Sequence, residues 1–305
     1  MQIRVLGSAA GGGFPQWNCG CPNCDGLRRG RIAAAPRTQA SVAVSADGEA
    51  WFVLNASPDI RAQIEGFPPL HPRAARHSPI AGIALTSGDL DHCLGLLHLR
   101  ESHPLVVYAT ESVRRGFTEG NVLYRTLERF PGQVTWRPLK PGQDEPLTRA
   151  DGRPSGLSVR ALPVPGKQPL HLTGRRPADP ADNVALLVRD AAGRALAYAP
   201  GVAAVTAEVR AVLDEADAVF FDGTFWSSDE MPALGLGDRR AEDMAHLPIG
   251  GPGGSLHALA GLRAPRRIYI HVNNTNPILR EDSAERRAVE AAGWTVAWDG
   301  MEVGL

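Results

Sequence analysis

The 305-residue sequence lacks an excess of charge of either sign, because 32 lysine and arginine residues face 33 aspartate and glutamate residues and leave a formal net charge of −1. Aromatic residues contribute only 6% of the chain. A nucleic-acid partner or an anionic membrane surface would require a basic excess. We therefore expect neither nucleic acid nor a membrane among the partners of this protein.

Long apolar runs and targeting signals are also missing. No uninterrupted apolar stretch approaches the roughly 18 residues that cross a bilayer. Residues 1–7 carry an early charge and a short apolar stretch before a glycine run, so they lack the basic head and apolar centre of a signal peptide. We therefore expect a cytoplasmic protein.

Cysteine is scarce, but most of it is clustered. Four cysteines are too few for a disulfide scaffold in a chain of this length, yet Cys19, Cys21 and Cys24 fall within six residues. In a cytoplasmic protein such thiols are more often metal ligands than disulfides. The spacing lets three sulfurs converge on one tetrahedral zinc ion, and three thiolates leave that ion little Lewis acidity. We expect a structural zinc site rather than ordinary loop cysteines, with a fourth ligand from a distant segment.

Hydrophobic residues make up 43% of the chain, which is ample for the core of one large or two small domains. Strands and helices mix without internal repeats or a long linker, and we expect one domain over residues 1–305. Two proline-rich stretches, 68–79 and 141–154, are expected to be surface loops. Apolar patterning predicts helices near residue 60, over 94–99, from 111 and over 202–213. It predicts strands over 2–6, 40–45, 51–55, 80–85, 105–109, 157–162, 184–188, 195–198, 218–221 and 267–271.

Acidic and histidine side chains stand where several apolar strands are expected to end. Asp89, Asp91 and His92 follow one such strand at the start of a helix, where carboxylates also serve as ordinary caps. His271 follows a second apolar run, and Asp222 closes a third. Several strand ends that carry ligand-type side chains are what an open metal site would present.

The order of these pieces carries a resemblance to known proteins. The matching stretches span almost the whole chain: residues 7–13 and 16–19, 37–39, 55–61, Asp89-Leu90-Asp91-His92, Asp222-Gly223-Thr224-Phe225-Trp226, 246–249 and 271–277. In this order they resemble the metallo-β-lactamase superfamily and, more closely, the pyrroloquinoline quinone (PQQ) biosynthesis protein B family. The resemblance implies an α/β fold, the αββα sandwich of two mixed β-sheets flanked by helices.

The same resemblance exposes lost metal ligands. The superfamily motif is His-x-His-x-Asp-His, whereas the matching window here has Ser87 and Asp89 in place of the two leading histidines. No histidine lies near 163–167, and no bridging aspartate follows residue 198. What remains is Asp91, His92 and His271, the two-histidine, one-carboxylate set that is diagnostic of non-haem Fe(II) oxygen chemistry.

The resemblance implies a role in the PQQ pathway. The implied substrate is a cross-linked glutamate–tyrosine diamino acid cut from a ribosomally made peptide, and the implied reaction is O2-dependent hydroxylation of its tyrosine-derived ring. Asp91, His92 and His271 would hold Fe(II), while Asp89 and Asp222 would orient ligands or move protons. The electron-rich ring suits oxygen chemistry and offers no scissile acyl or phosphoryl bond.

Further residues are candidates for binding roles. Arg37 and Arg61 could bind substrate carboxylates through bidentate hydrogen bonds. In related proteins with a three-cysteine zinc site, a histidine three residues after the late active-site histidine is the fourth ligand, and that position here is Asn274. Either its amide oxygen completes the zinc site, or His246 or another residue does. His246 is also a candidate substrate-binding residue.

Two alternatives to an oxygenase stay open. A hydrolase of the same fold would need two catalytic metals, against which the substitutions at Ser87 and Asp89 argue. A non-catalytic carrier that binds PQQ or its precursor and assists its transport to the periplasm would need the pocket but no iron chemistry. Other PQQ-pathway proteins are candidate partners, and a homodimer is left open.

Overall fold

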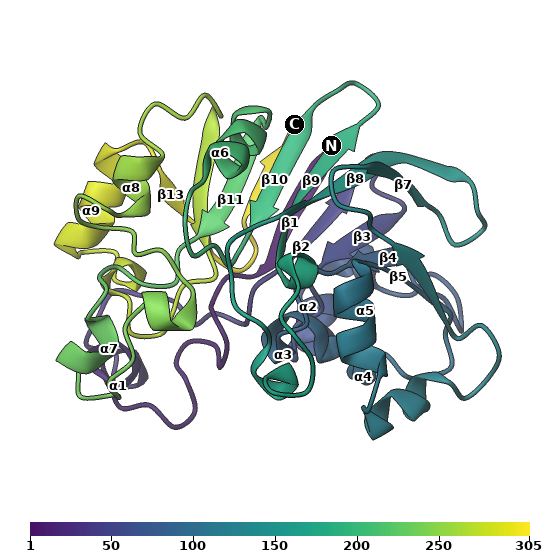
Figure 1. Cartoon of the computed structure of the whole chain (residues 1–305), viewed down its shortest axis with the longest axis horizontal. Helices are drawn as coiled ribbons and strands as arrows, with labels where there is room; N and C mark the ends of the chain where they lie inside the picture. The colour runs from purple at the N-terminus through teal and green to yellow at the C-terminus, as the bar shows by residue number, and fades with distance from the viewer.

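The computed structural model describes residues 1–305 and contains two seven-stranded sheets that face each other (Figure 1). The first sheet has the order β14 (Glu302–Gly304), β1 (Gln2–Gly7), β2 (Ser41–Ser45), β3 (Trp51–Leu54), β4 (Ile80–Ala84), β5 (Leu105–Ala109) and β6 (Val134–Pro138). The second has the order β13 (Thr295–Val296), β12 (Arg266–Ile270), β11 (Ala218–Asp222), β10 (Ala195–Ala199), β9 (Val184–Asp190), β8 (Pro154–Pro163) and β7 (Asp144–Thr148).

Both sheets are mixed. In the first, β14, β1, β2 and β3 pair antiparallel, and β3 to β6 pair parallel. In the second, β7 to β10 pair antiparallel, and β10 to β13 pair parallel. A core cluster of 27 buried residues draws on both sheets, with Phe52 and Leu54 from one and Tyr198 and Phe220 from the other.

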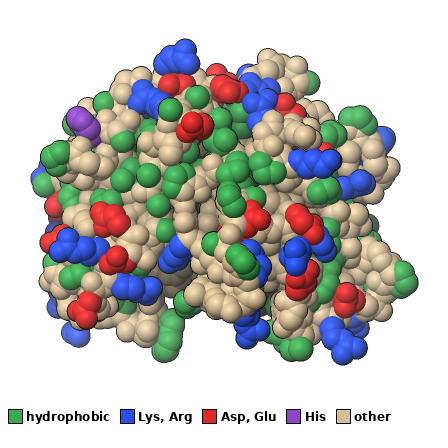
Figure 2. Space-filling model, in the orientation of Figure 1, with side chains coloured by type: hydrophobic (Ala, Val, Ile, Leu, Met, Phe, Trp, Pro, Cys, Tyr) green, Lys and Arg blue, Asp and Glu red, His purple; other side chains and the backbone are tan.

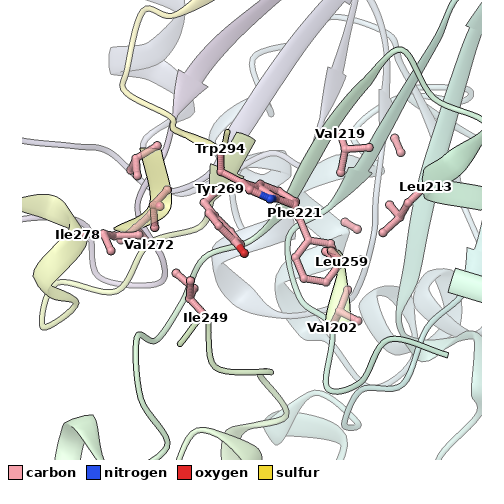
Figure 3. Close-up of a cluster of buried hydrophobic side chains, with 14 of the residues drawn as sticks. Val202, Leu213, Val219, Phe221, Ile249, Leu259, Tyr269, Val272, Ile278 and Trp294 are labelled. Atoms are coloured by element: carbon pink, nitrogen blue, oxygen red, sulfur yellow. The ribbon is translucent and has the colours of Figure 1, made fainter. Parts of the chain in front are cut away.

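Helices cover the outer faces of the two sheets (Figure 1). The helices over the first sheet are α2 (Ile60–Glu65), α4 (Gly95–His98) and α5 (Glu111–Thr118), and those over the second are α6 (Ala207–Asp214), α8 (Ser255–Ala258) and α9 (Ala284–Ala291). Figure 3 shows the cluster on the second side, where Tyr269 and Trp294 stack with ring centroids 4.3 Å apart. The expected αββα sandwich is confirmed.

The central parallel strands are buried along their whole length, as expected for strands covered on both faces. Every residue of β4 and β11 is buried. Gly82 lets β4 pass the neighbouring aromatic ring, because a Cβ there would lie 2.8 Å from Cε2 of Tyr108. These strands end at the lower edge of the sheets in Figure 1, where the candidate site residues follow them.

Two predictions about local structure are wrong. The helix expected over 202–213 begins only at Ala207, because the Thr206 side chain caps it by accepting from the Val209 N–H. Residues 202–206 form a loop instead. The stretch 141–154, expected to be a surface loop, contains β7, which pairs antiparallel with β8.

Charged side chains of both signs are interspersed over the face shown in Figure 2, without a large patch of one sign. This distribution agrees with the near-neutral composition. None of the helices combines the length and the apolar character needed to span a bilayer.

Candidate metal centres

The turn after β4 is held rigidly and leads into α3 (Leu90–Cys93), which carries two candidate ligands. The Asn55 Oδ1 atom accepts the Thr86 backbone N–H at 2.9 Å. The next helix, α4, begins at Gly95 and packs closely on the loop before α2. A Cβ on Gly95 would lie 2.3 Å from the carbonyl oxygen of Ser57. Only glycine fits this approach, which fixes α3 against the sheet.

His271 follows β12 and turns back toward α3. Its backbone is left-handed, with φ of 60°, which is uncommon for a residue with a side chain. Its Nε2 lies 3.0 Å from Oδ2 of Asp91, and Nε2 of His92 lies 3.8 Å from the same oxygen. Ligand atoms of Asp91, His92 and His271 all lie within 4.8 Å of one another, and both histidines are buried. The structure thus brings the three predicted iron ligands together.

A serine hydroxyl determines which nitrogen of His92 faces Asp91. The Ser87 Oγ donates to Oδ2 of Asp89 at 3.2 Å and lies 2.8 Å from Nδ1 of His92. Because an ionised carboxylate only accepts, the serine proton is committed to Asp89, and its oxygen accepts from the imidazole. His92 therefore carries its proton on Nδ1 and presents the lone pair of Nε2 to Asp91.

A threonine hydroxyl does the same for His271. The Thr224 Oγ1 donates to Oδ1 of Asp222 at 2.6 Å and lies 2.8 Å from Nδ1 of His271. The hydroxyl oxygen accepts the Nδ1–H, and Nε2 again faces Asp91, whose charge raises the pKa of His271 against its burial. Carboxylate partners behind ligating histidines are a regular feature of protein metal sites.

These tautomers leave a place for a cation. The Nε2 of His92 is buried and has no hydrogen-bond partner. The Nε2 lone pair of His271 meets a carboxylate oxygen of Asp91, an arrangement that repels unless a proton or a metal ion lies between them. In the absence of a metal ion, burial acts to raise the pKa of Asp91, but the positive charge of protonated His92 and His271 and the hydrogen bond from His271 hold it well below its usual range. A divalent ion would take the place of that positive charge. Two neutral imidazoles and an ionised carboxylate fit a divalent Fe(II) site.

His246 forms a second cluster behind the first. Its Nδ1 lies 2.7 Å from Oδ2 of Asp222, and its ring stacks on that of His271 at 5.5 Å. Burial acts to raise the pKa of Asp222, but the nearby imidazoles of His246 and His271 keep it below its usual value. The polar side-chain atoms of His246, Thr224 and Asp222 already bond one another. This cluster is therefore suited to carrying protons.

A cavity of about 410 Å³ opens onto both clusters. Asp89, Asp91, His92, His246 and His271 are among its lining residues. The Gly-rich turn after β1 also lines it, and a Cβ on Gly11 would lie only 3.4 Å from Oδ2 of Asp91. The glycine leaves the space beside that carboxylate free.

The three cysteines meet at the start of α1 (Pro22–Arg28). Their sulfurs lie within 4.8 Å of one another, and all three are buried. The side-chain amide nitrogen of Asn274 lies 3.2, 3.6 and 3.3 Å from the sulfurs of Cys19, Cys21 and Cys24. Turning this amide by 180° would bring its oxygen, a possible zinc ligand, to the same place beside the three sulfurs.

The cysteine cluster fits a cation, whereas His246 takes no part in it. Burial, together with the neighbouring thiols, raises the pKa of Cys21 to about 12, so a metal ion is needed to hold the cluster as thiolates. His246 is bonded to Asp222 at the cavity. Of the alternatives for a fourth zinc ligand, the structure therefore places Asn274 at the sulfurs.

The two arginines expected to bind carboxylates are not at the cavity. Arg37 is buried and donates to the carbonyl of Ala297. Burial lowers its pKa to about 10, against the opposing charge of Asp299. Arg61 is exposed on α2, and neither residue is among those that line the cavity. The sequence motifs that contain these arginines indicate neither that Arg37 is buried nor that both residues lie outside the cavity lining.

Residues that the sequence interpretation did not single out do line or support the site. Ser87 and Thr224 orient the histidines, yet Ser87 was noted only as a lost ligand. Lys167 lines the cavity from the loop after β8. Two sequence features could have indicated these roles: the hydroxyl of Thr224, two residues after Asp222, and Lys167 in the loop where the superfamily has a histidine.

Comparison with known proteins identifies the family of this chain. The model of the beta-lactamase superfamily domain matches residues 50–272. A coenzyme PQQ synthesis protein B of Azotobacter vinelandii is 47% identical over 309 residues, which is 100% of both chains. The chain belongs to the coenzyme PQQ synthesis protein B family.

Other members of this family agree in sequence and in structure. The coenzyme PQQ synthesis protein B of Pseudomonas aeruginosa strain PAO1 is 45% identical over the full length of both chains. The crystal structure of Zn(2+)-bound PqqB from Methylobacterium extorquens matches with a TM-score of 0.92 at 42% identity, covering 100% of each chain. A diphosphatase of the PhnP family, at 19% identity and a TM-score of 0.67, shares the fold.

Proposed function

We propose that this protein hydroxylates the tyrosine-derived ring of a glutamate–tyrosine diamino acid in coenzyme PQQ synthesis, with O2 as co-substrate. Membership of the family supports the place in PQQ synthesis. The observation that carries the metal assignment is the buried, unpartnered Nε2 of His92 facing Asp91 and His271. These three residues would hold Fe(II).

Fe(II) held by two histidines and one carboxylate would supply the activation of O2. The surrounding residues perform the supporting steps. His246 lines the cavity and would accept the phenol proton of the ring at Nε2. Asp222 accepts from its Nδ1 and holds the imidazole in that tautomer. Thr224 links this pair to His271, so proton movement and ligand orientation use one network.

A hydrolase with two catalytic metals is the less favoured function for this site. Ser87 and Asp89 stand where the superfamily has histidines, and they bond each other and His92 instead of pointing at a second ion. The zinc named for the relative from Methylobacterium extorquens shows that this family member binds metal. In our chain we assign structural zinc to Cys19, Cys21 and Cys24 with Asn274.

The proposal is tested by incubating Fe(II)-loaded protein with the diamino acid, O2 and ascorbate. Each oxygen atom inserted leaves the second atom of O2 to be reduced to water, which takes two electrons and two protons from the reductant. We expect a product heavier by one or two oxygen atoms, and none with zinc-loaded protein or without O2. Tight binding without a mass gain would support the carrier, and turnover without O2 would support the hydrolase.

A further inference from the structure

The cavity has one cationic side chain other than its histidines. The chain contains two lysines, Lys140 and Lys167, and only Lys167 lines the cavity. No arginine is among the lining residues. A divalent ion at the metal triad would balance the charges of Asp89 and Asp91, so Lys167 would supply the excess positive charge of the cavity.

The backbone of Lys167 is fixed relative to the metal turn. Its carbonyl accepts the Asn183 side-chain N–H at 2.7 Å, and Asn183 forms a bridge with Ser87. The next residue, Val184, donates its N–H to the carbonyl of Thr86 at 2.8 Å. Gly166 is needed for this contact, because a Cβ there would lie 2.6 Å from Cγ of Asn183.

The ammonium group is free for a ligand. No carboxylate lies within the 4.0 Å that defines an ion pair of Lys167. Lys167 is exposed at the open side of the cavity, and its loop also lines a second cavity of about 670 Å³ together with Asp179, Asp182 and Glu208. None of these three carboxylates pairs with Lys167, and two of them have other partners. Asp182 pairs with Arg176, and Asp179 accepts the Ala181 N–H at 2.8 Å.

We propose that Lys167 binds a carboxylate of the substrate and thereby directs the opposite end of the molecule, the phenol ring, toward Asp91, His92 and His271. The choice of a carboxylate rests on the proposed function, because the diamino acid carries carboxylates at its amino-acid ends. A charge-assisted hydrogen bond from an ammonium group to a carboxylate is stronger than a neutral one. Lys167 thus takes the role for which Arg37 and Arg61 are too remote.

The two lysines allow a test within one molecule. Zinc-loaded protein is treated with an amine-acetylating reagent, and the acetylated fractions of Lys167 and Lys140 are measured by peptide mass spectrometry. Saturating diamino acid or free glutamate should protect Lys167 at least about fivefold, while glutamate diamide, which has no carboxylate, protects much less and the exposed Lys140 is labelled equally throughout. Equal labelling of Lys167 with and without both carboxylate ligands would overturn the proposal.

Equilibrium binding of the diamino acid separates this proposal from the proposed reaction. We expect Lys167→Met to raise Kd by about tenfold or more, Lys167→Arg to restore most of it, and Lys140→Met to leave it unchanged. Normal Kd in Lys167→Met together with O2-dependent hydroxylation would refute the anchor and leave the oxygenase standing. Protection of Lys167 by glutamate without hydroxylation would support the anchor and refute the oxygenase.

Discussion

Two hydroxyl groups determine the chemistry of the metal triad at the scale of single residues. The hydroxyl groups of Ser87 and Thr224 each donate a hydrogen bond to a carboxylate and accept the Nδ1–H of a histidine. The Nε2 atoms of the two imidazoles consequently face one carboxylate oxygen of Asp91. The triad is arranged for a cation before any cation binds.

The first prediction concerns the hydroxyl of Thr224. Thr224→Val removes the acceptor for Nδ1–H of His271, and we expect the affinity for Fe(II) or Co(II) to fall by about 10–100-fold. Thr224→Ser keeps the hydroxyl and should stay within about threefold of the wild type. Co(II) titration followed by visible absorption measures both. An unchanged affinity in Thr224→Val, with an unchanged melting temperature, would contradict the role of the hydroxyl.

The second prediction concerns the buried carboxyl group of Glu230, at the start of α7 (Glu230–Ala233). Burial raises its pKa to about 7, while Thr275 and the Trp226 N–H bond its oxygens. The folded state therefore favours the protonated form. The stability contributed by Glu230 is full below pH 4.5, the ordinary pKa, and is lost as pH rises to about 7.

Glu230→Gln retains a donor and an acceptor but cannot ionise. We expect its free energy of unfolding, relative to the wild type, to rise by about 2–3 kcal/mol between pH 4.5 and pH 8. Urea unfolding at a series of pH values measures this difference. The exposed Glu242→Gln serves as the control and should show no such trend. A constant difference for Glu230→Gln would show that burial does not perturb this group.

At the residue scale, much of the candidate site was predictable. Asp91, His92 and His271 were identified because each stands where a buried strand gives way to a polar turn, and the structure brings them together. The orienting roles of Ser87 and Thr224 depend on hydrogen-bond directions that appear only in three dimensions. The catalytic roles of Asp91, His92 and His271 stay predictions.

At the scale of secondary-structure elements, the segment after β12 connects the two metal centres. His271 lies at one end of this segment, and Asn274 meets the cysteine sulfurs three residues later. The Asn23 side chain on α1 donates to the carbonyls of Asn274 at 3.2 Å and Asn276 at 2.9 Å. A zinc ion at the cysteines would therefore fix the position of His271.

The third prediction tests this connection. Cys21→Ser should lose one zinc per chain and bind Fe(II) about tenfold more weakly, because the segment 271–274 loses its attachment to α1. Metal analysis and Fe(II) titration measure the two effects. Trp17→Ser, in the same loop but 85% exposed, should change neither. Loss of zinc with full activity and unchanged iron affinity would separate the two centres.

The elements were predicted well where the chain is apolar and less well elsewhere. The buried strands β4, β5 and β11 stand within one residue of their predicted bounds, because continuous apolar runs specify them. β7 has the sequence Asp-Glu-Pro-Leu-Thr and buries only Leu147, so its pairing with β8 rather than its composition makes it a strand. The apolar run predicted an earlier helix start, but the Thr206 side chain caps the helix so that it begins at Ala207.

At the scale of the whole molecule, the sandwich places both metal centres at one edge of the two sheets. The cavity is surrounded by α3, which follows β4 of the first sheet, and by the segments that follow β11 and β12 of the second sheet. Family membership and a TM-score of 0.92 to a relative agree with the predicted architecture. One domain over residues 1–305 stays a prediction, as does a homodimer.

The measurement that most directly tests the account is the origin of the oxygen in the product. Protein with one Fe(II) per Asp91–His92–His271 site is incubated with the diamino acid and ascorbate under 18O2, and in parallel under 16O2 in H2(18)O. The account predicts that the ring gains label from 18O2 and none from water, with His92→Ala inactive. An unmodified substrate at verified iron occupancy, or label derived from water alone, would contradict it.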